Sequence, residues 1–462
     1  MRTARDYDAW KRAAEDFEGE TGLRAWRRDP TSDHYHEGLI RQQLTELRRL
    51  RGSGEVATLV DHLHESLHRN LGDVGSPELY NVSPLGTKDL IEEYLGEIEA
   101  TIDALVAADV PGWSLEQKRA TVERALANFG RSALLLSGGA TLGFYHLGVV
   151  KALWAADLLP DVITGASMGA MIAAGVCCRT DEELDTLFDG EVYDLQRRGL
   201  GPRGPLEMLR ERSLLRPEVL LDTIQNNCGV FTFEEAFARS GRVLNISVSP
   251  TRTRQKPRIL CHQTAGRVLI PSAALASSAV PGLFPPVTLT QRSRDGEERP
   301  YIPTERWIDG SFGADLPMMR ISRLHNVNHY IVSQANPHVV PFLHTSTRQG
   351  LSGFAMGMAV GAMRSQGMQA VALARLAMAA TPLKGSMDLL LSLAQQEYRG
   401  DIDIHPRFEP LQYRKLLRNP SRDDLAHFVL EGERATWPKL AMIRDQTRIA
   451  RCLTRALRAL KG

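Results

Sequence analysis

The sequence predicts an α/β protein with a buried, mostly parallel sheet that is covered by helices on both faces. Two observations lead to this fold class. Short apolar runs alternate with helical-looking segments in the middle of the chain, and charged stretches with helical spacing lie on either side. We therefore expect a helical amino-terminal domain at 1–130, an α/β domain at 131–345 and a helical carboxyl-terminal extension at 346–462.

The amino-terminal domain is predicted from amphipathic stretches at residues 6–20, 37–51, 56–71 and 87–107. The last stretch carries one apolar stripe at spacings of three and four residues: Leu90, Tyr94, Ile98, Ile102 and Leu105. Segments rich in glycine and proline separate several of these stretches, so we expect separate helices rather than one long rod.

The predicted strands are the apolar runs 133–136, 162–164, 243–248, 259–261 and 330–332. Short, nearly continuous apolar runs are typical of strands that are buried on both faces, as in parallel sheets. The helical-looking segments between several of them would supply the crossover connections.

The composition excludes several protein classes. The chain has 462 residues, 43% hydrophobic and 24% charged, with a net charge of +1, so neither disorder nor nucleic-acid binding is indicated. Five cysteines without a CxxC pair argue against a disulfide framework or a zinc ribbon and fit a reducing compartment. The amino terminus has no apolar signal region, and no uncharged stretch reaches the roughly 20 residues of a spanning helix. We expect a cytoplasmic protein, soluble or peripheral on a membrane or lipid droplet.

The strongest motif is Gly165-Ala166-Ser167-Met168-Gly169, between the predicted strand 162–164 and a helical-looking segment. A G-x-S-x-G on a strand–turn–helix is typical of a nucleophile elbow, in which flanking glycines allow a tight, strained turn. The following helix places its positive end near developing anionic charge. Ser167 is therefore predicted to be a catalytic nucleophile.

The second motif, at residues 138–143, reads Gly-Gly-Ala-Thr-Leu-Gly and follows the predicted strand 133–136. Small residues let backbone N–H groups converge on an oxygen, as in a phosphate cradle or an oxyanion hole. Ala140 stands where a dinucleotide fingerprint needs glycine, and no Walker A lysine follows. Beside the elbow, an oxyanion hole is the favoured interpretation.

The third motif is Asp309-Gly310-Ser311, after the apolar Trp307-Ile308. A carboxylate at a strand end can approach Ser167 across the top of the sheet, although a lone Asp-Gly is more often a simple turn. A Ser–His–Asp triad that adds His325, His329 or His338 is an alternative from the residues alone.

Taken together in this order, the three motifs resemble the patatin-like lipases. The segment SAALASSAVPGLFPP at 272–286 is similar to the stretch before the aspartate in that family. LLLSGGATLGFYHLGVVKAL and NVNHYIVSQANPH resemble the branch of yeast and plant seed-oil triacylglycerol lipases, whose helical amino-terminal domain of undefined role resembles residues 1–130. Two positions depart from the common pattern: Leu142 stands where many members have Arg or Lys, and Ser311 where Gly or Ala is frequent.

The resemblance implies a three-layer α/β/α fold and ester hydrolysis of an acyl lipid by a Ser–Asp dyad rather than a triad. Ser167 would be acylated, and Asp309 would take its proton and then activate the deacylating water. Backbone groups of the glycine-rich turn would form the oxyanion hole: Gly138, Gly139, Ala140 and Gly143. No metal or cofactor is implied. Triacylglycerol is the first expected substrate, and phospholipid hydrolysis or acyl transfer to a lysophospholipid is the alternative.

Two other features are open to two interpretations each. His62, His64 and His68 are expected on a solvated helix face rather than at a metal site. The methionine-rich stretch 354–380 fits an acyl groove or a core helix pair equally well.

The carboxyl-terminal helix has a basic face and an apolar face, and could bind an anionic lipid surface or dock on the protein. Its arginines share one face: Arg444, Arg448, Arg451, Arg455 and Arg458. A lipid-surface binding protein with weak hydrolase activity is accordingly the competing functional hypothesis. The sequence indicates no oligomeric state.

Overall fold

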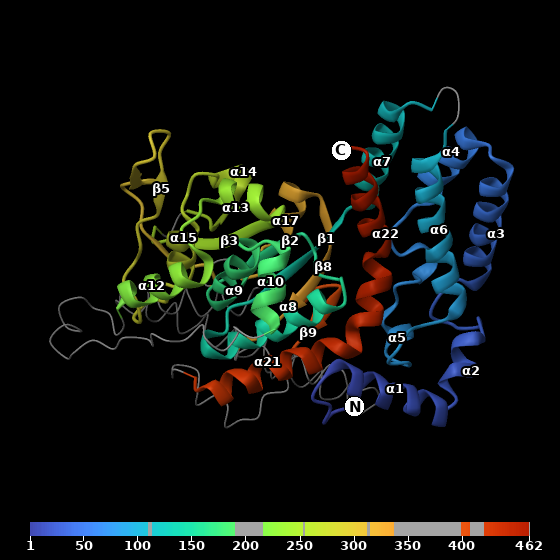
Figure 1. Cartoon of the computed structure of the whole chain (residues 1–462), viewed down its shortest axis with the longest axis horizontal. Coiled ribbons are helices and arrows are strands. Elements are labelled where there is room, and N and C mark those ends of the chain that lie inside the picture. Colours follow the sequence, from blue (N-terminus) through green and yellow to red (C-terminus); the bar gives the residue numbers. More distant parts are fainter. Residues whose placement is uncertain are drawn as a thin grey trace, which may run out of the picture.

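The structure is a computed structural model that describes residues 1–109, 113–189, 216–252, 255–311, 315–336, 399–406 and 420–461. Figure 1 shows the sheet domain on one side, the amino-terminal helices on the other, and the long helix α22 (Leu440–Ala459) between them. Within the described residues, no helix is long and apolar enough to cross a membrane.

The central sheet of the described residues has seven strands, in the order β4-β3-β2-β1-β8-β9, with β7 paired to β3. All pairs are parallel except those of β4 and β7 with β3, which confirms the predicted α/β class. The strands are β1 (Arg131–Leu136), β2 (Val162–Gly165), β3 (Val243–Pro250), β4 (Arg258–Leu260), β7 (Trp307–Asp309), β8 (Val327–Ser333) and β9 (Ile402–Ile404). A separate hairpin pairs β5 (Thr290–Arg292) with β6 (Glu298–Pro300).

One part of the predicted carboxyl-terminal extension differs from the expectation of helices alone. Strand β9 lies in that extension and pairs in parallel with β8, from Ile331↔Ile402 to Ser333↔Ile404. Ile402 and Ile404 are buried on either side of Asp403, which is the alternation of an edge strand with one covered face. The run is too short for the apolar pattern to reveal it.

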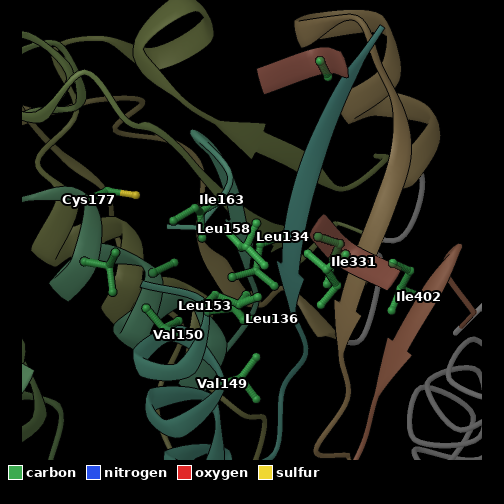
Figure 2. Packing of buried hydrophobic residues seen from close by; sticks show 14 of the residues in the cluster. Leu134, Leu136, Val149, Val150, Leu153, Leu158, Ile163, Cys177, Ile331 and Ile402 are labelled. Carbon is green, nitrogen blue, oxygen red and sulfur yellow. The ribbon is translucent and has the colours of Figure 1, made fainter. Parts of the chain in front are cut away.

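The two faces of the sheet carry separate apolar clusters, as side chains alternate along each strand. On one face, Leu134, Leu136 and Ile331 pack against α8 (Tyr145–Ala155) and α9 (Met168–Cys177) (Figure 2). On the other face, Ala133 and Leu135 pack in a cluster with Ile321 of α17 (Met318–His325). The described elements thus form the three layers that the resemblance implied.

Helix α21 (Arg422–Thr436), from the carboxyl-terminal extension, crosses α8 at very close range. A Cβ at Gly148 would lie 1.8 Å from the Val429 carbonyl oxygen, and one at Gly432 would lie 2.2 Å from the Tyr145 carbonyl oxygen. Only glycine fits at both positions. The extension is therefore packed into the α/β domain rather than appended to it.

The amino-terminal domain contains the helices expected from its amphipathic stretches, and the apolar stripe of α6 is buried. Helix α4 ends at Ser66, earlier than predicted, because Leu67 leaves the helical region with φ −79° and ψ 77°. The helices of the amino-terminal domain are α1 (Tyr7–Glu20), α2 (Leu23–Arg28), α3 (Glu37–Ser53), α4 (Val56–Ser66), α5 (Pro77–Tyr80), α6 (Asp89–Ala107) and α7 (Leu115–Phe129). In the described part of the α/β domain, further helices are α10 (Asp181–Asp189), α12 (Pro217–Cys228), α13 (Phe233–Ser240), α14 (His262–Ala265) and α15 (Ile270–Ser277).

The arginines of α22 pair with acidic residues of the fold, although Arg455 and Arg458 remain 60% and 64% exposed. Arg448 lies 2.7 Å from Glu99 of α6, and Arg458 lies 2.7 Å from Asp161. Arg444 and Arg455 pair with acidic residues of the same helix α6, at 3.3 and 3.0 Å. The geometry favours the docked-helix alternative, because the apolar side of α22, with Met442, Ile449 and Leu453, is buried and its arginines have acidic partners. The methionine-rich stretch 354–380 lies outside the described residues.

Candidate active site

The three predicted motifs meet at one edge of the central sheet. Strands β1 and β2 are parallel and adjacent, with Leu136 opposite Gly165, so the segments that follow them emerge together. Asp309 ends β7 and pairs with Val248 near the end of β3, on the other side of β2. The carboxyl ends of parallel strands are where α/β folds hold their ligands.

Ser167 has the backbone geometry of a nucleophile elbow, with φ 52° and ψ −123°. A non-glycine residue at such angles costs about 1–3 kcal/mol, so the surrounding structure must enforce it. The flanking glycines leave the space: a Cβ at Gly165 would lie 2.3 Å from the Gly169 oxygen, and one at Gly169 would lie 2.2 Å from the Leu136 oxygen. Helix α9 then begins at Met168, directly after the serine.

Ser277 fastens the elbow from the opposite side. The Ser167 backbone N–H donates to the Ser277 hydroxyl at 3.0 Å, and that hydroxyl donates to the Ser247 carbonyl at 2.7 Å. Ser277 is fully buried at the end of α15. Its role could not be predicted from the sequence, because nothing in the pattern of residues 272–286 indicates which strand Ser277 reaches.

Asp309 is a buried carboxylate, only 1% exposed. Burial raises its pKa to about 6, while donors from Ser311 and the nearby Ser167 hydroxyl keep the pKa from rising further. The Ser311 backbone N–H donates to Asp309 Oδ1 at 2.8 Å, and a Cβ at Gly310 would lie 2.1 Å from the Ser247 oxygen. The structure therefore brings Ser167 and the carboxylate together, and the acid has a pKa suited to accept a proton near neutrality.

The glycine-rich turn lies beside Ser167 and Asp309, but not all of its N–H groups are available to bind an oxyanion. The Gly138 N–H donates to Asp315 Oδ1 at 2.8 Å, so this predicted donor is occupied. Gly143 provides clearance, since a Cβ there would lie 2.5 Å from Met168 Cγ. The N–H groups of Gly139 and Ala140 have no acceptor among the described residues, which leaves them for an incoming ligand.

Comparison with known proteins decides the family. A family model described as "Patatin-like phospholipase" matches residues 134–320, and one described as "Domain of unknown function (DUF3336)" matches residues 1–126. Triacylglycerol lipase ptl3 of Schizosaccharomyces pombe is 32% identical, over 100% of this chain and 98% of that protein. The chain belongs to the patatin-like lipases. The resemblance seen in the motifs is thereby confirmed.

Two further relatives are longer proteins. Triacylglycerol lipase SDP1L of Arabidopsis thaliana is 34% identical over 96% of this chain and 56% of its own length. Triacylglycerol lipase 4 of Saccharomyces cerevisiae is 31% identical over 99% of this chain and 52% of its own length. The chain therefore spans little more than half the length of these two relatives.

Two histidines considered for a triad lie away from the elbow. His329 is opposite Ser132 near the start of β1, about 13 Å along the strand from Leu136 at about 3.3 Å per residue. His325 precedes β8 and pairs through Nε2 with Asn245 Oδ1 at 2.7 Å. The third, His338, lies outside the described residues.

One histidine near this site belongs to none of the three sequence motifs. His146 of α8 is completely buried, with Nδ1 2.7 Å from the Ser333 hydroxyl and Nε2 3.0 Å from the Ser137 carbonyl oxygen. Burial lowers its pKa to about 4, so the ring is neutral at pH 7. Because both nitrogens are engaged, His146 ties the ends of β1 and β8 together and is not placed as a proton acceptor.

No group of three or more residues that could hold a metal occurs in the described part of the chain. His62 and His64 are half-buried and His68 is exposed, on and after α4 in the amino-terminal domain. Cys177 and Cys178 are buried behind the elbow at the end of α9, and burial raises the pKa of Cys177 to about 12.

Proposed function

We propose that this chain is a serine lipid acyl hydrolase of the triacylglycerol lipase type, acting through a Ser167–Asp309 dyad. The observation that carries the proposal is the strained Ser167 turn next to a buried carboxylate whose pKa is about 6. The named activity of relatives that share about a third of the sequence supports the substrate class.

In the acylation half, the Ser167 hydroxyl oxygen attacks the ester carbonyl and its proton passes to Asp309. The tetrahedral oxyanion faces the N–H groups of Gly139 and Ala140 and the amino end of α9. Stabilisation of this kind is worth about 3–4 kcal/mol per donor. The C–O bond then breaks, the leaving alcohol takes the proton from Asp309, and an acyl-Ser167 ester remains.

In the deacylation half, water attacks the acyl-Ser167 ester while Asp309 accepts a proton from it. The second tetrahedral oxyanion collapses, the fatty acid leaves, and the proton returns to Ser167. A raised pKa makes Asp309 a stronger base than an exposed aspartate while it stays mostly ionised at pH 7. No other base is needed for the balance of protons.

The test compares trioleoylglycerol emulsions with phosphatidylcholine vesicles, using wild type, Ser167→Ala and the control Ser293→Ala. Ser293 lies in the turn between β5 and β6, outside the site. We expect fatty acid release from the emulsion by wild type and Ser293→Ala, and none by Ser167→Ala. Release from the vesicles only would replace the lipase assignment with a phospholipase. Release that survives in Ser167→Ala would contradict the proposal altogether.

A further inference from the structure

A second buried acid lies beside the dyad and takes no part in the proton transfers described above. Asp315 is only 1% exposed, and burial raises its pKa to about 7, helped by the charge of Asp309. Burying an ionisable group costs stability unless its partners compensate, and such groups concentrate at functional sites. The groups that contact Asp315 indicate what this buried acid does.

Two neutral groups donate to the Asp315 carboxylate, one to each oxygen. The Gly138 N–H lies 2.8 Å from Oδ1, and the Asn336 amide nitrogen lies 2.5 Å from Oδ2. Gly138 is the first residue of the turn whose next two N–H groups, at Gly139 and Ala140, are left for a ligand. Ala140 has φ 45°, so this turn also needs an external restraint.

Asn336 is itself held in place by the sheet. Its backbone N–H donates to Gln334 Oε1 at 3.0 Å, and the Gln334 N–H donates to the Ile404 carbonyl at 2.9 Å. A chain of hydrogen bonds thus runs from the ends of β8 and β9, through Asn336 and Asp315, to Gly138. These bonds fix the position of the glycine-rich turn relative to the carboxyl ends of β8 and β9.

Ser311 closes the space between the two acids and the turn. A Cβ at Gly138 would lie 2.5 Å from Ser311 Oγ and 3.2 Å from Asn336 Oδ1, so these two side chains pack directly against the turn. The Ser311 hydroxyl lowers the pKa of both Asp309 and Asp315, and Ser311 Oγ lies against the turn at Gly138, so Ser311 is a near neighbour of both acids and of the turn.

We propose that Asp315 is a positioning residue for ester hydrolysis, holding Gly138 so that the N–H groups of Gly139 and Ala140 face the oxyanion formed at Ser167. It touches neither substrate nor nucleophile, and it acts through the turn. The inference deepens the proposed hydrolase function and rests on it. Displacing catalytic donors by about 1 Å is enough to reduce a rate by roughly 100-fold.

The test exchanges the two partners. Asp315→Asn presents an amide to the Asn336 amide, and Asn336→Asp presents a carboxylate to the Asp315 carboxylate. The double variant Asp315→Asn/Asn336→Asp restores one donor and one acceptor, and the amide oxygen introduced at position 315 can still accept from the Gly138 N–H. The control is Asp403→Asn, a half-buried aspartate that accepts from the Gly400 N–H at 2.9 Å at the edge strand β9.

The readouts are kcat and KM for p-nitrophenyl butyrate, the Tm, and the rate of Ser167 labelling by a fluorophosphonate. We expect kcat to fall about 10-fold in Asp315→Asn and about 100-fold in Asn336→Asp, with KM within about twofold of wild type. The double variant should recover to within about threefold of wild type. Asp403→Asn should keep the wild-type kcat, because its glycine is not part of the turn.

Two results would overturn the inference while leaving the hydrolase function intact: single variants with wild-type kcat, or a folded double variant no more active than the weaker single. If a single variant fails to fold, the folded double variant decides, since near-wild-type kcat supports the inference and a loss beyond about 100-fold refutes it. A wild-type chain that neither cleaves the ester nor reacts with the fluorophosphonate refutes the proposed function and the inference with it.

Discussion

The two ends of the central sheet bury polar groups for different purposes. At the carboxyl end, Asp309 and Asp315 are buried acids whose pKa values burial raises to about 6 and about 7. At the amino end, His325 and His329 are buried bases whose pKa values burial lowers to about 4, which makes them neutral at pH 7. The first end keeps ionisable groups close to their titration point, and the second keeps them uncharged.

The bonding partners differ in the same way. At the amino end, His329 bonds Ser132 and Gln446 of α22, and Gln446 donates to the Gly75 carbonyl. These bonds connect the sheet, α22 and the amino-terminal domain, so they stabilise the assembly of the chain. At the carboxyl end the bonds converge on the elbow and the glycine-rich turn. Burying Asp309 and Asp315 at that end lowers the stability of the fold, and we attribute their burial to a role in ester hydrolysis.

The largest expected contrast comes from one substitution at each end. Ser167→Ala should reduce ester hydrolysis by at least about 10³-fold while changing the unfolding free energy by less than about 1 kcal/mol. His329→Ala should do the reverse, with activity within about threefold and a stability loss of about 1–3 kcal/mol, because Ser132 and Gln446 lose a buried partner. Ester kinetics and urea unfolding of both variants measure it. Equal losses of activity in Ser167→Ala and His329→Ala would contradict the proposed difference between the two ends of the sheet.

The elbow glycines provide the next contrast. Gly169→Ala should destabilise the fold by several kcal/mol, since its Cβ would meet the Leu136 oxygen at 2.2 Å, where no flexible side chain can yield. Gly52→Ala is the matched control in α3, because no atom lies within 4 Å of its Cβ. That variant should gain up to about 1 kcal/mol as a helical alanine. Thermal unfolding of both variants decides, and a stable Gly169→Ala protein would contradict the packing at the elbow.

The cost of the buried acid should appear as a gain of stability in Asp309→Asn. The folded pKa of about 6 lies above the unfolded value of 3.8, so the acid's contribution to stability is present below pH 4 and lost as pH rises through 6. At pH 8 the asparagine variant should be more stable by up to about 3 kcal/mol, and the difference should shrink toward zero near pH 4. Urea unfolding at several pH values tests this. An Asp309→Asn variant less stable than wild type at pH 8 would contradict the claim that burying ionised Asp309 destabilises the fold.

The same group predicts the pH dependence of the reaction. Asp309 must be ionised to accept the serine proton, so kcat/KM should fall about tenfold for each pH unit below about 6 and level off above it. The amino-end histidines should leave this profile unchanged. A profile of the His329→Ala variant that differs from wild type would place a histidine in the reaction.

The smallest effect is expected where α22 joins the amino-terminal domain. Burial alone would raise the pKa of Glu99, but bonds from Arg448 and Arg455 lower it overall. Arg448→Ala should cost about 1 kcal/mol of stability, less at high salt, with ester activity unchanged. Salt-dependent unfolding measures it. A loss of lipid binding with stability unchanged would restore the membrane interpretation of this face.

Periodicity and local motifs predicted much of this architecture. The stripe of α6, the strand before each motif and the Ser167 elbow follow from spacing, because each depends on neighbours in sequence. The partners of the basic face of α22 could not be read from the helix itself, since its arginines pair with Glu99 and Asp161 from distant segments.

The residues missed at the site are the ones that act across the sheet. Ser277, Asp315 and Asn336 each bond an element far away in sequence, and none belongs to a short catalytic motif. The sequence around His146 did not indicate its role, because its partner Ser333 lies on β8, far away in the sequence. Gly138 was predicted as an oxyanion donor because the turn was recognised without the acid that occupies its N–H.

The most direct test of the central claim, a dyad without a histidine, is the kcat/KM of p-nitrophenyl butyrate hydrolysis in five variants. They are Ser167→Ala, Asp309→Asn, His325→Ala, His329→Ala and His338→Ala. We predict a loss of at least about 10³-fold in the first two and activity within about threefold of wild type in the folded histidine variants. A histidine variant that keeps its fold and loses activity as completely as Asp309→Asn would contradict the dyad.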